Sequence, residues 1–556
     1  MSAPIAYQEL HGQRQPVQVA YVVQGPVYGF AVGAYDATRP LIIDPVLQAT
    51  YSGGTEDDFI RAVAVGPTGD IYVGGNTSST NFPGVAGGAQ SSLAVGVDGF
   101  VARYNATLTA LLQATYFGGG GEDRIHALAV DATSVYIGGS TRSTNLPGVA
   151  GGAVPAMPAG TTCAAFVARL PLALTSVTQA TYLAGANDGG CFNPELLDKR
   201  VNAIVLSGTE VYVTGNYSGD AFPLGAGGAP PVPFSSSAIG FVSRLNLALT
   251  TINQSSGLGN NLATTLGNAL AVDGSNVYVA GITTGGLTGS AGGAQPLSGG
   301  GADGFVMQFN AALTAVQQST FIGGSGADRV FAMALSGGEV FVHGETDSTN
   351  LPNTAGGAQP LPAGNLDGFV ARFNAALTSN PQSTYLGGSV IEFAYSMVAS
   401  GGSIYVAGFT NSNDFPDTAG GIEPTSCGGC SYVARLAPSL TTIQQATYYG
   451  GPTRTDPFAM TATGSEIILA GMVTAAGLPG AIGGAQPTLG GAGNQDGFVA
   501  RLTADLLGAA GAAPVIITAS PLPAATVGVG YVATIAATGD APITFTVTLG
   551  SLPTSR

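Results

Sequence analysis

Residues 62–75 read Ala-Val-Ala-Val-Gly-Pro-Thr-Gly-Asp-Ile-Tyr-Val-Gly-Gly, and this stretch decides the fold. Its two halves alternate with period two, and Gly-Pro-Thr-Gly between them is a tight turn whose glycines permit positive φ. The stretch therefore predicts two antiparallel strands, Arg61–Val65 and Asp70–Gly75. The same pattern predicts two more strands in this unit, Gly99–Tyr104 and Gln113–Phe117.

Three phrases show that this four-stranded unit occurs seven times. The first, Gln-Ala-Thr-Tyr, returns in intact or degraded form at intervals of 63 to 75 residues and ends at Tyr51, Tyr116, Tyr182, Gly257, Phe321, Tyr385 and Tyr448. The second, Asp-Gly-Phe-Val-Ala-Arg, places its aromatic residue at Phe100, Phe166, Phe241, Phe305, Phe369, Tyr432 and Phe498. The third, Val-Tyr-Val-x-Gly, has its second residue at Tyr72, Tyr136, Tyr212, Tyr278, Phe341, Tyr405 and Ile468. Such self-similarity is the signature of a repeat architecture.

Seven four-stranded sheets without a helical period predict an all-β protein, a seven-bladed β-propeller in which radial repetition protects the sheet edges. We expect the Ala-Val-Ala-Val strand nearest the axis, where space is tightest, and the Gln-Ala-Thr-Tyr strand outermost. The first outer strand, Val46–Ser52, precedes every inner strand, and the last blade, from about residue 458 to 502, lacks one. We therefore expect this N-terminal strand to close the ring by completing the seventh blade.

The composition agrees with a folded, acidic protein. Of its 556 residues, 45% are apolar and only 9% are charged, with 32 Asp and Glu against 16 Lys and Arg. The net charge of −16 argues against nucleic acid, whose binding requires cations that neutralise phosphates, and against anionic membrane surfaces. No run reaches the roughly 18 apolar residues that a spanning helix needs, so we expect no membrane insertion.

The repeated phrases resemble a known family. Ala-Thr-Tyr-x-Gly-Gly, the stretch at 62–75 and Asn-Phe-Pro at 81–83 are similar to the bacterial SBBP-type β-propeller repeat, over residues 46–507. Residues 1–45 resemble the end of the β-rich domain that often precedes these repeats, and residues 508–556 resemble the first half of a bacterial Ig-like module. The resemblance implies a large secreted or cell-surface bacterial protein, usually without assigned chemistry.

Both flanking segments are short for the domains they resemble. Each has about 45 residues, whereas a closed β-sandwich needs roughly 100. Either the sequence is a piece of a longer protein, or the incomplete sandwiches of neighbouring chains complete each other by strand addition. The second alternative predicts a head-to-tail contact that propagates into a filament.

Long loops place any binding site on one face of the ring. The loop from Asn76 to Asp98 and the inter-blade loop from Gly53 to Arg61 are expected on the same rim, where long loops on a rigid scaffold often bind ligands. Acidic residues in or beside the inter-blade loops are the candidate ligand-binding groups around one mouth of the channel: Asp58, Asp123, Asp188, Asp328, Glu392 and Asp456. The alternative is that these carboxylates are solvated or cap turns.

Calcium is the one cofactor that the sequence suggests. Asp123 and Asp328 each end a Gly-Gly-x-Gly-x-Asp phrase, but the tandem stacking that serves calcium-binding repeats is excluded because the two copies lie on different blades. A single-loop calcium site with carboxylate and carbonyl ligands is the remaining interpretation at these positions.

The four cysteines predict two local disulfides in an oxidising compartment, Cys163–Cys191 and Cys427–Cys430. Free thiols are one alternative, and a redox-active Cys-x-x-Cys pair is a second one that lacks its usual βαβ setting. A shared zinc site is disfavoured because the two pairs fall in the second and sixth blades, far apart round the ring.

Catalytic patterns are weak. The three histidines, His11, His126 and His343, each stand alone in their phrases, and no Gly-x-Ser-x-Gly motif is present. The arginine that ends the second phrase recurs in six blades, which favours a hydrogen-bonding post between blades at 103, 169, 244, 372, 435 and 501.

These observations predict a non-enzymatic structural and interaction protein of the extracellular space or cell surface. Its expected partners are itself, as a head-to-tail homopolymer, or other cell-surface proteins or glycans. The alternative functions are a polysaccharide-acting enzyme and a calcium-dependent adhesin, each with its site on the long-loop face. An enzyme would require different polar residues on one blade's loops, and the loop from Gly185 to Arg200 is the clearest such break in the repeat.

Overall fold

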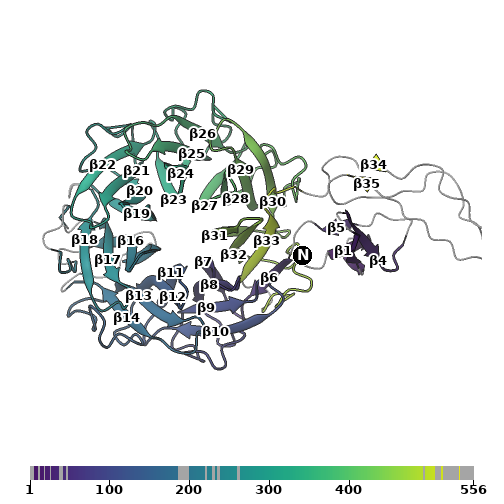
Figure 1. Ribbon diagram of the computed structural model, residues 1–556, viewed down its shortest axis with the longest axis horizontal. Helices are drawn as coiled ribbons and strands as arrows, with labels where there is room; N and C mark the ends of the chain where they lie inside the picture. The colour runs from purple at the N-terminus through teal and green to yellow at the C-terminus, as the bar shows by residue number, and fades with distance from the viewer. Residues whose placement is uncertain are drawn as a thin grey trace, which may run out of the picture.

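A computed structural model describes residues 5–10, 13–17, 19–24, 27–36, 42–44, 48–185, 199–218, 222–227, 232–233, 238–259, 263–491, 495–507, 515–516 and 537–538. The described residues form strands β1–β35 and contain no helix, and seven four-stranded antiparallel blades surround a central axis (Figure 1). The predicted all-β, seven-bladed propeller is confirmed. Within the described part of the chain, no helix is long and apolar enough to cross a membrane.

In the first six blades the strands run outward from the axis in chain order, as predicted, and the seventh blade takes its outermost strand from the start of the propeller. The innermost strands are β7 (Asp58–Val65), β11 (Asp123–Val130), β15 (Arg200–Ser207), β19 (Thr265–Val272), β23 (Asp328–Ser336), β27 (Glu392–Ser400) and β31 (Thr455–Thr463). The second strands are β8 (Ile71–Thr77), β12 (Ser134–Thr141), β16 (Glu210–Ser218), β20 (Asn276–Thr283), β24 (Glu339–Thr346), β28 (Ser403–Thr410) and β32 (Glu466–Val473).

The third strands are β9 (Asp98–Tyr104), β13 (Ala164–Pro171), β17 (Ala238–Asn246), β21 (Asp303–Asn310), β25 (Asp367–Asn374), β29 (Cys430–Leu436) and β33 (Asp496–Thr503). The outermost strands are β10 (Leu111–Phe117), β14 (Gln179–Leu183), β18 (Ile252–Gly257), β22 (Val316–Ile322), β26 (Gln382–Leu386), β30 (Ile443–Tyr449) and, in the seventh blade, β6 (Gln48–Ser52). The third and fourth blades also share one parallel bridge, between Ile239 and Thr265.

The predicted closure of the ring is confirmed. Strand β6 pairs antiparallel with β33, with Tyr51 opposite Phe498, so the first strand of the propeller completes its last blade (Figure 1). The Tyr51 side chain is buried, and its hydroxyl accepts a hydrogen bond from the Leu478 N–H at 2.9 Å. This non-covalent clasp joins the two ends of the ring.

Blades pack through buried apolar faces, and tyrosines of the second strands add hydrogen bonds between neighbours. The hydroxyl of Tyr72 donates to the Leu172 carbonyl of the next blade at 3.1 Å, and four other blades repeat this bond from Tyr136, Tyr212, Tyr278 and Tyr405. The acceptor always lies in the turn between the third and outermost strands of the next blade, or in the corresponding turn after β33. These tyrosines hold adjacent wedges together.

The arginine of the second phrase mostly bonds within its own blade, so its predicted role as a post between blades is wrong. Arg372 pairs with Glu339 and Arg501 with Glu466, each at 2.7 Å, across the second and third strands of one sheet. Arg103 pairs with Asp70 at 2.6 Å and reaches the next blade only through a 3.4 Å bond to a carbonyl. Arg103 pairs with Tyr72 of the second strand in the β-ladder. Its guanidinium therefore lies close to Asp70, which directly precedes that strand.

A leucine with positive φ recurs in the turn after the third strand. Leu108 has φ of 58°, its side chain is fully buried, and its carbonyl accepts from the Ala485 N–H of the preceding blade at 2.8 Å. The same conformation recurs at Leu174, Leu249, Leu313, Leu377, Leu440 and Leu506. A non-glycine residue in this region is strained, and burial against the neighbouring blade is what maintains it here.

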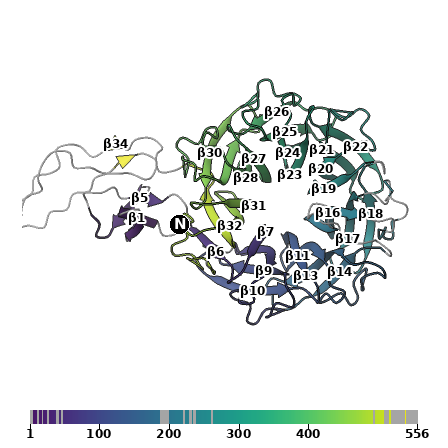
Figure 2. The same ribbon diagram turned by 180° about the vertical axis from the view of Figure 1, so that it is seen from behind.

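The flanking segments form small separate sheets. Strands β2 (Gln13–Val17), β1 (Ile5–Leu10) and β5 (Ile42–Asp44) make a three-stranded sheet, of which Figure 2 labels β1 and β5. Strand β3 (Val19–Gln24) pairs with β4 (Val27–Val32). Towards the C-terminus, β34 (Val515–Ile516) pairs with β35 (Ala537–Thr538). The rest of the predicted Ig-like segment lies outside the described residues.

Candidate functional site

The acidic residues predicted around the channel mouth begin the inner strands and are buried. Five of them are fully buried, namely Asp58, Asp123, Asp328, Glu392 and Asp456. Asp58 Oδ2 accepts hydrogen bonds from the Gly54 N–H at 2.7 Å and from the Ser79 hydroxyl at 2.9 Å. These side chains lie at the base of the loops instead of in a solvated ring at the channel mouth, because the inner strands begin about three residues earlier than expected. The alternative of turn-capping carboxylates is confirmed.

The same capping arrangement recurs on other blades. Asp123 accepts from the Gly119 N–H and the Ser143 hydroxyl, both at 2.7 Å, and Asp328 accepts from the equivalent groups of Gly324 and Ser348. Burial raises the pKa of Asp58 and of Glu392 to about 7. These groups hold the inter-blade loops against the long loops, so the predicted placement of both loop sets on one rim is confirmed.

The remaining acidic candidates differ. Asp456 lies one position further along its strand, is buried, and pairs with Arg454 at 2.9 Å, while Thr455 occupies the position of Asp58. Asp188 lies outside the described residues. Among the described residues, no group of three or more His, Cys, Asp or Glu side chains is placed to hold a metal ion, so neither Asp123 nor Asp328 has such a group around it.

A β-bulge at one position of every inner strand re-aims a side chain that the sequence reading did not single out as a site. In β7 the register against β8 shifts between Ile60 and Ala62, and the extra residue is Arg61. The same shift makes the extra residue His126 in the second blade and Tyr395 in the sixth. Bulges of this kind often direct side chains at functional sites.

The bulged residues and their neighbours line a cavity of about 660 Å³ among the inner strands of blades 6, 7, 1, 2 and 3. Its lining includes four arginines, Arg61, Arg124, Arg200 and Arg454, and only two carboxylates, Asp57 and Asp456. The chain has 16 Lys and Arg in all and a net charge of −16, so this cavity concentrates positive charge in an acidic protein.

Aromatic rings hold part of this charge in place. The guanidinium of Arg61 lies 4.1 Å from the centroid of the Phe458 ring and 5.3 Å from that of Phe59. The Phe458 ring also meets Tyr395 edge-on at 5.1 Å. Cation–π contacts of this kind fix the plane of a guanidinium.

His126 lies within this positive field. Burial lowers its pKa well below the ordinary value, and the charges of Arg200, Arg61 and Arg124 lower it further. Its Nε2 atom lies 3.5 Å from the Ser140 hydroxyl. The imidazole is therefore neutral at pH 7, and the positive charge of the cavity comes from arginine.

In the third and fourth blades, amide side chains at the bulge bind the next inner strand. The bulged residue Asn202 donates to the Gly267 carbonyl of the next inner strand at 2.9 Å, and Asn268 donates to the Val330 carbonyl at 2.8 Å. These asparagines link inner strands to one another. The third and fourth blades thus use the bulged position for amide bridges, whereas the first, second, sixth and seventh blades place an arginine, a histidine or an aromatic ring there.

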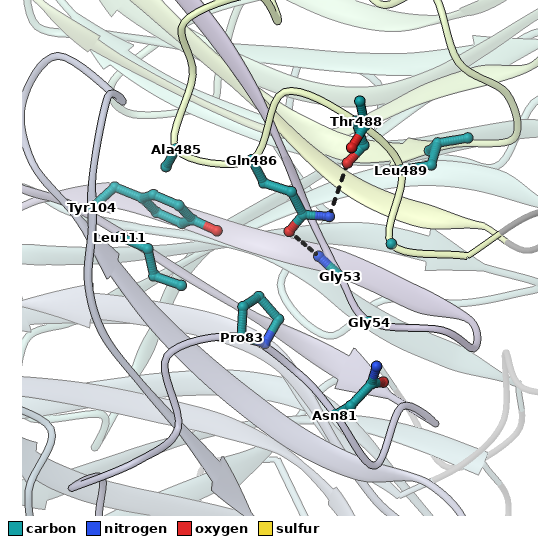
Figure 3. Close-up of a pocket in the computed structure, with 11 residues that line it drawn as sticks. Gly53, Gly54, Asn81, Pro83, Tyr104, Leu111, Ala485, Gln486, Thr488 and Leu489 are labelled. Atoms are coloured by element: carbon teal, nitrogen blue, oxygen red, sulfur yellow. Dashed lines mark hydrogen bonds between the residues drawn. The ribbon is translucent and has the colours of Figure 1, made fainter.

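A second, smaller cavity of about 290 Å³ lies beside the clasp, between the seventh and first blades (Figure 3). In it the Gln486 side chain accepts from the Gly53 N–H at 3.2 Å and donates to the Thr488 carbonyl at 3.1 Å. Tyr104 and Leu111 form its apolar side. This cavity has no charged group in its lining and is the weaker candidate.

The described cysteines and His343 have structural settings. Cys427 and Cys430 form the predicted disulfide, and Cys163 is also disulfide-bonded, whereas its predicted partner Cys191 lies outside the described residues. His343 is fully buried between the Phe369 carbonyl and the Tyr432 hydroxyl, which confirms its structural reading. His11 lies outside the described residues.

Comparison with known proteins adds one family match. Residues 1–46 match a family described as a domain of unknown function, DUF7948, which fits the expected β-rich segment ahead of a β-propeller repeat protein. No curated protein matches the chain.

Solved structures that resemble the chain are propellers of diverse function. Hydrazine synthase of Kuenenia stuttgartiensis is 9% identical with a TM-score of 0.37, over 75% of this chain and 93% of that one. The WD40 propeller domain of Doa1 is 8% identical with a TM-score of 0.36, over 81% and 96%. Quinohemoprotein alcohol dehydrogenase of Comamonas testosteroni is 9% identical with a TM-score of 0.40, over 86% and 79%. Similarities of this size carry no inference about activity.

Proposed function

We propose that the protein is a non-enzymatic binding module of the extracellular space or cell surface, and that it binds an acidic glycan at the arginine-lined side of its central channel. The observation that carries this proposal is the gathering of Arg61, Arg124, Arg200 and Arg454 round one cavity of an otherwise acidic chain. Arginine forks match carboxylate and sulfate groups, and the neighbouring aromatic rings offer flat faces for sugars.

The cysteines support an extracellular location. Cys427 and Cys430 are joined, Cys163 is disulfide-bonded, and the described residues contain no free cysteine. Disulfides persist in oxidising compartments and are rare in the cytosol. The expected location, cell surface or extracellular, remains part of the proposal.

Self-assembly is the second part of the proposed function. Strands β2 and β5 each pair only with β1 among the described residues, and β3 and β4 form a two-stranded ribbon. Small sheets of this kind present edges to which a strand from another chain can add. Negative-stain electron microscopy of concentrated protein tests this point: filaments support it, and monodisperse rings contradict it.

Glycan binding is tested by titrating uronic-acid and sulfated oligosaccharides, with neutral oligosaccharides of the same length as controls. The Arg61→Gln and Arg200→Gln variants are each expected to weaken binding about tenfold, which corresponds to about 1.4 kcal/mol. Arg372→Gln is the matched control, since Arg372 pairs with Glu339 and is not part of the cavity lining.

Two outcomes would overturn this assignment. If all variants bind neutral and acidic glycans equally well, the arginines do not contact the glycan. Release of shortened or unsaturated sugars during the same incubation makes the protein an enzyme, and an assay of His126→Asn then tests the only histidine in the cavity lining.

A further inference from the structure

Three of the seven blade junctions bury a pair of aspartates at one equivalent position. In each pair, the first residue of an inner strand lies beside the first residue of the preceding blade's third strand. The pairs are Asp58 with Asp496, Asp123 with Asp98, and Asp328 with Asp303, and all six side chains are fully buried.

A glycine allows the two carboxylates of each pair to approach each other. A Cβ atom on Gly53 would lie 2.7 Å from both Asp496 Oδ1 and Asp58 Oδ2. A Cβ on Gly118 or Gly323 would meet the same two oxygens of its own pair. Calcium keeps its oxygen ligands at about 2.3–2.6 Å and bridges carboxylates that face each other in this way.

The pairs contain buried oxygens without a hydrogen-bond donor. Within the described residues, no hydrogen bond reaches the Oδ1 atoms of Asp98, Asp303 and Asp496, which are the oxygens that face the inner-strand aspartate of each pair. Their Oδ2 atoms, in contrast, accept N–H groups of the glycine-rich loops, as Asp496 does from Gly490 at 2.6 Å. An orphaned carboxylate oxygen beside a second carboxylate is strongly unfavourable in a buried site unless a proton or a metal cation lies with them.

The junction of the second and third blades lacks both acids. At the junction of the second and third blades, Ala164 replaces the first acid and Lys199, the only lysine of the chain, replaces the second. The Lys199 side chain is 1% exposed, and its ammonium lies 5.6 Å from the Tyr217 ring centroid. A covalently attached cation thus stands at the position where three other junctions place two aspartates.

The Asp367–Glu392 junction satisfies its acids differently. Glutamate is one methylene longer, and the two side chains are hydrogen-bonded to each other. The Glu392 Oε1 atom accepts from the Thr410 hydroxyl at 2.7 Å, and Oε2 accepts from the Gly388 N–H at 3.1 Å. No oxygen of this pair lacks a hydrogen-bond partner. A hydrogen bond between two carboxyl groups requires a proton on one of them, so this pair shares a proton.

We propose that each of the three Asp–Asp junctions binds one calcium ion between the two carboxylates and so ties neighbouring blades together. Each pair supplies only two side-chain ligands, so the remaining ligands come from loop carbonyl oxygens and water, which calcium accepts in irregular arrangements. This proposal is independent of the glycan site, since none of the six aspartates lines the arginine cavity.

Native mass spectrometry of the full chain, stripped with a chelator and then supplied with calcium, tests the proposal directly. Three bound ions per chain are expected, with no such uptake when magnesium is supplied instead. Asp98→Asn and Asp303→Asn should each bind two ions, because asparagine retains the shape but not the charge. Asp367→Asn is the matched control and should still bind three.

Thermal unfolding gives a second readout. Calcium should raise the melting temperature of the unaltered chain, since a ligand that binds only the folded state stabilises it, and each Asp→Asn variant should show a smaller rise. Absence of calcium uptake by the unaltered chain would overturn the proposal whatever the variants do. An Asp98→Asn chain that melts higher than the unaltered chain without calcium, and binds no fewer ions, would show that the pair holds a proton instead.

Discussion

The outer and inner strands of the same blades differ in how closely they repeat. On an outer strand, the Gln113 side chain donates to the carbonyls of Gly84 and Ala86 at 2.9 and 3.1 Å, and the glutamines of most other blades make the same pair of bonds. At the bulge of the inner strands the residue changes from blade to blade: Arg61, His126, Asn202, Asn268, Phe331, Tyr395 and Phe458. Repetition therefore maintains the ring, whereas variation at one bulged position provides its chemistry.

Replacing a repeated outer-strand tyrosine should lower the free energy of unfolding of the propeller more than any other change considered below. Tyr116 is fully buried, and its hydroxyl donates to the Ser79 carbonyl at 2.7 Å and accepts from the Phe82 N–H at 3.0 Å. We expect Tyr116→Ala to lower the free energy of unfolding by about 3–5 kcal/mol, because an aromatic side chain is lost from a packed core. Urea denaturation measures this change, and Tyr116→Phe should lose only about 1–2 kcal/mol.

The second largest effect concerns the framework position occupied by His343. Other blades have glycine, alanine or threonine there, whereas His343 Nδ1 donates to the Phe369 carbonyl at 3.0 Å and Nε2 accepts from the Tyr432 hydroxyl at 3.1 Å. Burial lowers the pKa of His343 to about 4, below its value of about 6.5 in the unfolded chain. Its stabilising contribution is therefore complete above pH 6.5 and is lost as the pH falls to 4.

The loss amounts to about 3 kcal/mol between pH 7 and pH 4. It is measured as the difference in unfolding free energy between the unaltered chain and His343→Leu, at several pH values, so that other titrating groups cancel. A difference that stays constant over this range would show that the imidazole has the same pKa in the folded and the unfolded chain.

The disulfide of the sixth blade should contribute less. Cys430 begins β29 at the position where β9 begins with Asp98, and it closes a loop of four residues with Cys427. Because a short loop removes little entropy from the unfolded chain, we expect loss of this disulfide to lower the free energy of unfolding by about 2 kcal/mol. Denaturation of the unaltered chain and of a Cys427→Ser, Cys430→Ser double variant measures it, and a double variant that does not fold would contradict the expectation.

The smallest effect on stability is expected at the variable bulge itself. Arg61→Gln removes a cation–π contact with Phe458 and should lower the free energy of unfolding by only about 0.5–1 kcal/mol. The same variant is expected to weaken glycan binding about tenfold. A loss of stability as large as that of Tyr116→Ala would contradict the view that the bulged residues contribute little to the stability of the ring.

The repeated phrases were sufficient to predict the blades and their closure. Period-two alternation and glycine turns placed the strands, and an unmatched outer strand at Val46–Ser52 implied the clasp with the seventh blade. These inferences succeed because every blade satisfies the same local rules. The alternation predicts only Arg61–Val65 as the inner strand, so we expected residues 58–60 in a loop, whereas β7 begins at Asp58.

The channel side chains were missed for a physical reason. A bulge between Ile60 and Ala62 interrupts the alternation, so simple period-two counting places the side chains before it on the wrong face. The signal was present in the phrases Asp-Arg-Ile-His and Lys-Arg-Val-Asn at 123–126 and 199–202, where cationic and polar residues begin successive inner strands. The proximity of Asp98 to Asp123 could not be inferred, since it depends on how adjacent blades pack.

The clasp also orders events during synthesis. Strand β6 leaves the ribosome before any of the blades, yet its partner β33 begins only at residue 496. At about 5–20 residues per second, translation of the roughly 450 intervening residues takes about 20–90 seconds. For that interval the nascent chain is an open arc with a solitary strand at its leading end, and a ribosome that stalls before the seventh blade leaves the arc unable to shut.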